Sequence, residues 1–305
     1  MALATTSEDL GGRFGEVAAD YERWLSRQPL SENTRRTYRT RVRGLLQYLT
    51  ATPAEYGDPL SNEHARDYAI RDYKSHLKTV HKAKPASVNL TLAAIDNFYR
   101  FMGMGTPDTK REDLPGVAPG ALSPEEQKRF LRAVERSNSA RDRAIARVLF
   151  FAGLRVSELV GLDVDDVSIS ARKGRVTVRS GKGDAYREVA LNVEAREALE
   201  KWLTGRKEYP YADGAALFLN LKGGRLSSRA VDMIIRRFGE EAAIEKPVSA
   251  HILRHTCMTN LVRNGNDLVL VAEIAGHKRL ETTRRYSLPS EADRQAAMEG
   301  IRVEY

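Results

Sequence analysis

The stretch GMGTPDTKREDLPGVAPG, residues 103–120, constrains the fold most, because it divides the chain into two parts. It is rich in glycine and proline and has neither a helical nor a strand period, which is typical of a linker. A chain of 305 residues is long enough for about two domains with cores of their own. We therefore predict a first domain over residues 1–105, a linker over 106–121 and a second domain over 122–305.

The first part repeats the apolar spacing of amphipathic helices. Helices are expected over 13–27, 31–49, 62–80 and from Pro85 to near Gly103, which together predict a compact helical bundle. The helix over 31–49 carries four arginines on the face opposite its apolar residues: Arg35, Arg36, Arg39 and Arg43. On an isolated helix such a face is usually only solvated, and the functional alternative is a stripe that binds phosphate groups.

The second part mixes helices with one β-hairpin. A capping box of Ser123 and Glu126 begins its first helix, and another helix covers 140–151. Two alternating runs, 175–179 and 186–192, flank the tip SGKGDA and predict a hairpin. Further helices are expected over 193–205, 228–243, 249–264, 266–275, 280–287 and 290–300. The predicted fold class is thus mainly α with a small β-hairpin or sheet, in which a helical bundle precedes an α+β domain.

Charge and composition narrow the choice of partner and compartment. The formal net charge is +8, of which residues 116–305 contribute +6, so a polyanion such as nucleic acid is a plausible partner. The single cysteine, Cys257, excludes an intramolecular disulfide framework and a cysteine-rich zinc module. No apolar run approaches the roughly 20 residues that span a bilayer, and the N-terminus lacks the pattern of a signal peptide. We expect a cytoplasmic protein with no membrane partner and no metal site.

Short motifs in the second part hold residues that suit chemistry on a phosphate. They are Arg155 and Glu158 in GLRVSEL, Lys182 at the hairpin tip, His251 and Arg254 in HILRH, and His277 followed nine residues later by Tyr286. Arginine offers a planar fork to phosphate oxygens, and histidine can donate or accept a hydrogen bond. Taken singly, each motif has a commoner structural explanation, namely an intrahelical ion pair, a turn lysine, a helix cap or a core tyrosine.

The order and spacing of these motifs resemble the tyrosine recombinase family, also called the phage integrase family, which includes the Xer-type bacterial recombinases. The resemblance covers residues from about 122 to 288. Residues 1–105 fit the family's N-terminal core-binding domain in size and class only. The resemblance implies that the fold is such a core-binding bundle followed by a tyrosine recombinase catalytic domain.

The resemblance also implies a role for each matched residue. Tyr286 would attack a DNA phosphodiester and form a 3′-phosphotyrosyl link, while Arg155 and Arg254 would hold the non-bridging oxygens. His251 and His277 would hydrogen-bond the phosphate or handle the tyrosine proton. Lys182 would protonate the leaving 5′-oxygen, and Glu158 would support the arginine.

The implied activity is site-specific recombination of DNA through a Holliday junction, without metal, ATP or another cofactor. The implied partner is double-stranded DNA with an inverted-repeat core site, bound on the nucleoid by a homotetramer that holds two such sites. The tail over 290–305 would dock on the neighbouring subunit, and a paralogous partner recombinase is left open. On the helix over 228–238, Arg229, Arg236 and Arg237 are further candidates for contact with DNA.

The sequence is compatible with two enzymatic functions and with one function that is limited to DNA binding. The lack of an extra N-terminal arm-binding domain favours an Xer-like or transposon-resolution type over a large phage integrase. A type IB topoisomerase and a non-catalytic DNA-binding accessory protein are the alternatives, and the two-domain layout with a complete set of motif residues favours the recombinase. One departure is Val248-Ser249-Ala250, where many relatives have a proline before the first histidine. We therefore expect an altered helix start with function retained.

Overall fold

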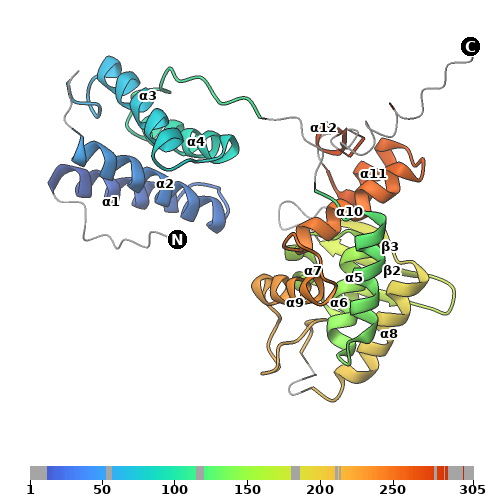
Figure 1. The fold of residues 1–305 in the computed structure, drawn as a ribbon. Coiled ribbons are helices and arrows are strands. Elements are labelled where there is room, and N and C mark those ends of the chain that lie inside the picture. The colour runs from blue at the N-terminus through green and yellow to red at the C-terminus, as the bar shows by residue number, and fades with distance from the viewer. Residues whose placement is uncertain are drawn as a thin grey trace, which may run out of the picture. The chain divides into compact units, whose positions relative to one another are not determined.

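The structure is a computed structural model that describes residues 12–52, 57–114, 120–179, 186–209, 212, 214–277, 280–284, 286–287 and 298 (Figure 1). It separates into two compact units, Met1–Pro115 and Gly116–Tyr305. Each unit has its own hydrophobic core.

In its described residues, the first unit is a bundle of four helices, as its apolar spacing predicts (Figure 1). They are α1 (Gly12–Ser26), α2 (Glu32–Ala51), α3 (Glu63–Thr79) and α4 (Pro85–Phe101). Aromatic rings fill much of the core, and Tyr21 meets Phe98 edge-on with ring centroids 5.3 Å apart. Side chains that accept a backbone N–H define two helix starts, Ser31 before α2 and Asn62 before α3. The prediction of a helical bundle is confirmed.

The described part of the predicted linker, residues 106–114, has no regular secondary structure but is bound to the first unit. Lys74 and Lys78 of α3 both contact the Glu112 carboxylate, at 2.8 and 3.0 Å. Arg111 donates a hydrogen bond to the backbone oxygen of Asn89 in α4 at 2.8 Å. This segment therefore belongs physically to the first unit, although its composition is that of a linker.

The described part of the second unit is mainly helical, with one small sheet. Its elements are α5 (Pro124–Arg136), α6 (Ala140–Ala152), α7 (Val156–Gly161), η2 (Val164–Asp166), β1 (Val167–Ile169), β2 (Gly174–Arg179), β3 (Tyr186–Ala190), α8 (Val193–Arg206), α9 (Ser228–Glu241), α10 (Ala250–Arg263), α11 (Leu268–Ala275) and α12 (Leu280–Arg284). The predicted hairpin is present as β2 and β3, paired antiparallel with Val176 opposite Val189. A third strand, β1, pairs with the other edge of β2, so the predicted hairpin is one part of a three-stranded sheet.

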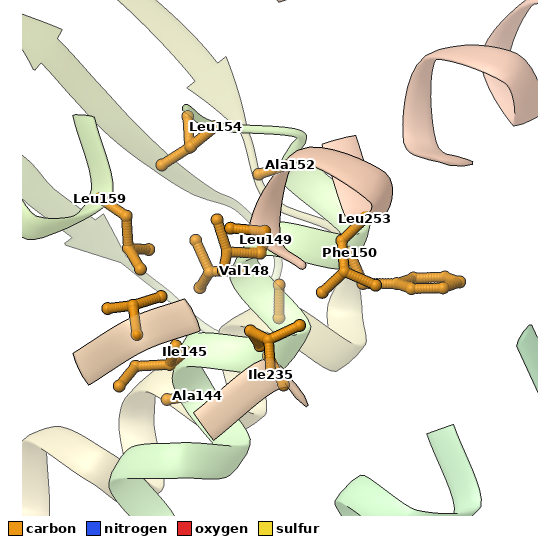
Figure 2. Packing of buried hydrophobic residues seen from close by; sticks show 14 of the residues in the cluster. Ala144, Ile145, Val148, Leu149, Phe150, Ala152, Leu154, Leu159, Ile235 and Leu253 are labelled. Carbon is orange, nitrogen blue, oxygen red and sulfur yellow. The ribbon is translucent and has the colours of Figure 1, made fainter. Parts of the chain in front are cut away.

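Helix α6 is the centre of the second core. Its residues Ala144, Ile145, Val148 and Leu149 are fully buried, on more than one face of the helix. Figure 2 shows these side chains facing Leu159, Ile235 and Leu253, which come from α7, α9 and α10. A helix buried over most of its surface fixes its neighbours tightly, because interiors are packed as densely as organic crystals. Helix α7, which begins directly after Arg155, and helix α10, which carries Arg254, thus pack on the same helix.

Candidate active site

Arg155 is positioned by a sharp turn at the end of α6. Gly153 caps that helix in the left-handed region, with a φ of 60°, which favours glycine. A Cβ at this position would lie 2.4 Å from Cε of Met258 and 3.1 Å from Sγ of Cys257. The chain then passes through the buried Leu154, and Arg155 becomes the N-cap of α7. Glycine is therefore required both for the turn and for its close approach to α10.

Glu158 holds two arginines in place. Its carboxylate accepts hydrogen bonds from the backbone N–H of Arg155 at 2.8 Å and from that residue's Nη1 at 2.6 Å. It also accepts two from Arg187 of β3, at 3.0 and 2.8 Å. Burial raises the pKa of Glu158, but the hydrogen bonds from Arg187 and Arg155 outweigh it and lower that pKa to about 2. Glu158 is thus a permanent anion that orients both guanidinium groups.

Arg254 is the most buried cation of the site, with 3% of its surface exposed. Its Nη1 donates to the backbone oxygen of Gly153 at 2.6 Å and its Nη2 to that of Ala275 at 2.5 Å. Burial, followed by the nearby charge of Arg155, lowers the pKa of Arg254 to about 10. It therefore remains charged at neutral pH in a place where an added anion would be favourable.

The C-terminal end of α11 gathers three arginines. The backbone oxygens of Ile274, Ala275 and Gly276 are consecutive acceptors, and each receives a hydrogen bond from a different guanidinium. The donors are Arg187 at 3.1 Å, Arg254 at 2.5 Å and Arg155 at 3.0 Å. A helix C-terminus carries unpaired carbonyls and partial negative charge, so it stabilises clustered cations that would otherwise repel.

His277 follows this helix end and is fixed through both ring nitrogens. Its Nε2 lies 3.1 Å from Nη2 of Arg254, and its Nδ1 lies 2.8 Å from Oγ1 of Thr283. Because a guanidinium can only donate, Nε2 must accept, and the ring proton is on Nδ1. Burial and then the charges of Arg254 and Arg155 lower the pKa of His277 to about 4. The ring is thus neutral at physiological pH.

Tyr286 lies against two histidines. Its ring is nearly parallel to that of His277, with an interplanar angle of 7° and centroids 6.1 Å apart. Its hydroxyl lies 2.9 Å from Nδ1 of His255 on α10. The residue is 6% exposed and packs in a small cluster with Cys257 and Met258. The Tyr286 hydroxyl is therefore held by a hydrogen bond, although the ring of Tyr286 packs among apolar side chains.

His251 contacts His255, the histidine that lies beside the Tyr286 hydroxyl. The two residues are four apart on α10, and their rings meet edge-on with centroids 4.0 Å apart. Helix α10 begins at Ala250: Ser249 caps it by accepting from the N–H of Ile252, and Asp232 accepts from the N–H of Ala250. A serine side chain thus caps the start of this helix.

The fold brings together six of the seven predicted chemical positions, and Lys182 lies outside the described residues. The six are Arg155, Glu158, His251, Arg254, His277 and Tyr286. Sequence reasoning missed Arg187 and His255. His255 could have been found, because it directly follows Arg254 and lies four residues after His251 on the same helix.

The arginines predicted to bind DNA have unequal surroundings. On α2, Arg39 and Arg43 both contact the Glu22 carboxylate, and Arg35 donates to the backbone oxygen of Gln28, whereas Arg36 is exposed. On α9, Arg229, Arg236 and Arg237 are all exposed. Arg236 contacts Glu240 at 3.4 Å, and Arg237 contacts the buried Asp142 at 2.8 Å. The exposed residues of the set are therefore Arg36, Arg229, Arg236 and Arg237, whereas Arg35, Arg39 and Arg43 are partly buried.

The described residues offer neither a membrane-spanning helix nor a cluster of metal ligands. None of these helices is both long and apolar enough to cross a membrane. Within the same residues, no group of three or more His, Cys, Asp and Glu side chains is arranged to hold a metal ion.

Comparisons with known proteins match both units. Residues 121–292 match the phage integrase family, and residues 19–103 match the N-terminal SAM-like domain of phage integrases. Tyrosine recombinase XerC of Myxococcus xanthus is 36% identical over 242 residues, which cover 75% of this chain and 78% of that protein. Tyrosine recombinase XerA of Thermococcus kodakarensis is 33% identical over 277 residues, covering 89% and 90%.

A solved structure shares the fold. The XerH site-specific recombinase, bound to a palindromic difH substrate in a post-cleavage complex, matches with a TM-score of 0.72 at 23% identity, covering 92% of this chain and 83% of that one. The family match extends over more than half of the chain and includes every motif named above. The chain therefore belongs to the phage integrase family, the tyrosine recombinases.

Proposed function

We propose that this protein is a site-specific DNA recombinase that cuts and rejoins strands through a 3′-phosphotyrosyl link at Tyr286. The observation that carries the proposal is the pair of guanidinium groups, Arg155 and Arg254, held side by side on the end of α11 close to Tyr286 and His277. Family membership supports it, as do the names of the relatives, which are tyrosine recombinases.

The arginines are suited to a phosphodiester. A guanidinium has five N–H donors, and the three hydrogen bonds of Arg254 leave donors for a phosphate oxygen. Arg155 keeps 41% of its side chain exposed and can meet a ligand from the outside. As phosphorus becomes five-coordinate, charge grows on the non-bridging oxygens, and donors fixed beforehand stabilise it without rearrangement.

Proton transfer completes the proposed step. The tyrosine oxygen bonds to phosphorus while the bond from phosphorus to the 5′-oxygen breaks, and Lys182 protonates that oxygen. Such acid help at a leaving group contributes typically about 10²- to 10⁴-fold. The phosphotyrosyl bond conserves the energy of the broken link, so the 5′-hydroxyl of a second strand can displace the tyrosine without ATP. His251 and His277 would hydrogen-bond the phosphate.

The proposed partner is double-stranded DNA with an inverted-repeat core site. The SAM-like unit and the catalytic unit would both bind it, with Arg36, Arg229 and Arg236 in contact with phosphates. Among structures with the same fold, lambda integrase is bound as a dimer to a COC′ core site and as a tetramer to a Holliday junction. We propose that this protein acts on the nucleoid as a homotetramer in which the tail over 290–305 docks on the neighbouring subunit. A paralogous recombinase is an alternative partner.

Covalent capture would test the function and find the site. The protein would be incubated with a library of nicked duplexes whose half-sites are random inverted repeats, and DNA bound through a detergent-stable link would be sequenced. The proposal expects one recovered consensus and no adduct with Tyr286→Phe. Relaxation of supercoiled plasmid without a preferred site would instead indicate topoisomerase chemistry. Binding of a consensus without adduct would indicate an accessory role.

A further inference from the structure

We propose that His255 accepts the proton of Tyr286 when the tyrosine attacks DNA, an inference that rests on the proposed function. The nucleophile of that reaction is a phenol with an ordinary pKa of about 10, so it reacts slowly until its proton is taken. Nδ1 of His255 lies 2.9 Å from the hydroxyl, which is within reach for direct transfer. No role for His255 follows from the motif residues named earlier.

His277 is unsuited to this task in spite of its stacking on Tyr286. Its Nε2 accepts from Arg254 and its Nδ1 donates to Thr283, so neither nitrogen is directed at the phenol oxygen. Burial and the two arginines also lower the pKa of His277 to about 4, which makes it a weak base at neutral pH. The two histidines beside Tyr286 therefore have different roles, with His277 on the phosphate side.

The helix that carries His255 explains why this geometry is reproducible. Arg254 and His255 are adjacent on α10, so one rigid element presents a phosphate ligand and a base. Arg254 is fixed by the backbone oxygens of Gly153 and Ala275, and the ring of His255 is fixed by its edge-on contact with His251. The proposed base and the proposed phosphate ligand are thus held relative to each other by one helix.

The proposed step is balanced in protons and bonds. In the reactive tautomer Nδ1 of His255 is unprotonated and Nε2 carries the proton. The O–H bond of Tyr286 breaks, its proton moves to Nδ1, the phenol oxygen bonds to phosphorus, and the 5′-oxygen leaves with a proton from Lys182. In rejoining, the 5′-hydroxyl gives its proton to Lys182 as its oxygen bonds to phosphorus. The bond from phosphorus to Tyr286 breaks, and the imidazolium of His255 returns its proton to the tyrosine oxygen.

The test uses the duplex recovered by covalent capture, nicked so that cleavage is irreversible, and measures adduct formation in a single turnover. His255→Ala should slow cleavage by about 10²-fold or more while its affinity for the duplex stays near that of the wild type. His255→Asn keeps a hydrogen-bonding group near Tyr286 but cannot take a proton, and it should be equally slow. A wild-type rate for His255→Asn would show that the residue only positions the tyrosine and would overturn the inference.

Chemical rescue separates a base from a structural support. Added imidazole should restore cleavage by His255→Ala in proportion to the concentration of free base, and should not restore His277→Ala. Rescue of His277→Ala in place of His255→Ala would transfer the role to His277 and overturn the inference.

A substrate with sulfur in place of the 5′-bridging oxygen needs no acid at its leaving group. With this substrate, Lys182→Ala should cleave at close to the wild-type rate, while His255→Ala should remain slow. A normal rate for His255→Ala would instead show that His255 protonates the leaving 5′-oxygen. If the wild-type protein forms no adduct with any duplex, the proposed function itself fails and the role of His255 fails with it. If the wild-type protein forms the adduct and only the expected rates of the His255 variants are wrong, the proposed recombinase function is unaffected.

Discussion

The carboxylate of Glu158 accepts a hydrogen bond from each terminal nitrogen of Arg187, at 3.0 and 2.8 Å. The same carboxylate bonds to Arg155, so a residue of the hairpin and a residue proposed to bind phosphate share one anion. Since the pair is mostly buried, removing either partner would leave an uncompensated charge.

Replacing Glu158 by glutamine should destabilise the second unit in a pH-dependent way. The folded-state pKa of about 2 lies below the ordinary 4.5, so the contribution is fully present above pH 4.5 and is lost as the pH falls towards 2. At pH 7 we expect a loss of roughly 2–3 kcal/mol, measured by urea unfolding at several pH values. Glu188→Gln, in an exposed ion pair with Arg175, is the matched control and should cost under about 0.5 kcal/mol. Equal losses for both variants at all pH values would contradict this prediction.

Replacing Arg187 by lysine should slow cleavage although the charge is kept. Lysine cannot reproduce two parallel hydrogen bonds to Glu158 together with a third to the backbone oxygen of Ile274. We expect adduct formation to fall about 10-fold or more, as positioning errors near a reacting centre commonly do. Arg175→Lys on the neighbouring strand, where the pair with Glu188 is exposed, should leave the rate unchanged. A normal rate for Arg187→Lys would show that a point charge suffices.

His277 should stay neutral, with its proton on Nδ1, throughout the neutral range. Its pKa of about 4 lies below the ordinary 6.5, so the unfolded chain binds this proton first and stability falls as the pH drops from 6.5 to 4. Nitrogen-15 NMR of the histidine rings would report both the tautomer and the titration. In Thr283→Val, which removes the acceptor of Nδ1, the tautomer preference should weaken. A His277 signal that becomes doubly protonated near pH 6.5 would refute the assignment.

Gly153→Ala should damage both stability and cleavage. The new Cβ would combine a positive φ with contacts of 2.4 Å to Met258 and 3.1 Å to Cys257. We expect a loss of at least about 2 kcal/mol in the free energy of unfolding. The rate of cleavage should also fall, because the turn sets the start of α7 and thus Arg155. Gly161→Ala, where nothing lies within 4 Å, is the control and should be nearly neutral.

The secondary structure was largely predictable, because local patterns encode it. The capping box of Ser123 and Glu126 forms as the sequence indicates, and the apolar spacing of 140–151 matches α6 closely. Strand β1 was missed, since three residues after an acidic turn are too short for a period to appear. The helix predicted over 280–287 is shorter, as α12 ends at Arg284, and the one over 290–300 lies outside the described residues except for Met298.

The contacts within the candidate site were less predictable than its members. The sequence motifs indicated Arg155, Arg254 and Tyr286, but the partner of the tyrosine hydroxyl depends on how the chain turns after α11. No periodic pattern encodes that turn, so His255 was passed over although it lies within a quoted motif. Arg187 was missed for a similar reason, because strand alternation gives its face but not the helix end that β3 approaches.

The three consecutive carbonyls at the end of α11 make the site tolerant of one kind of change and intolerant of another. Since the acceptors belong to the backbone, substitution of Ile274 or Ala275 cannot delete them. Insertion or deletion of a single residue within α11 would rotate that helix end by about 100° and misdirect all three acceptors at once. Among related proteins, the amino acids of α11 should therefore vary while the length of this helix stays the same.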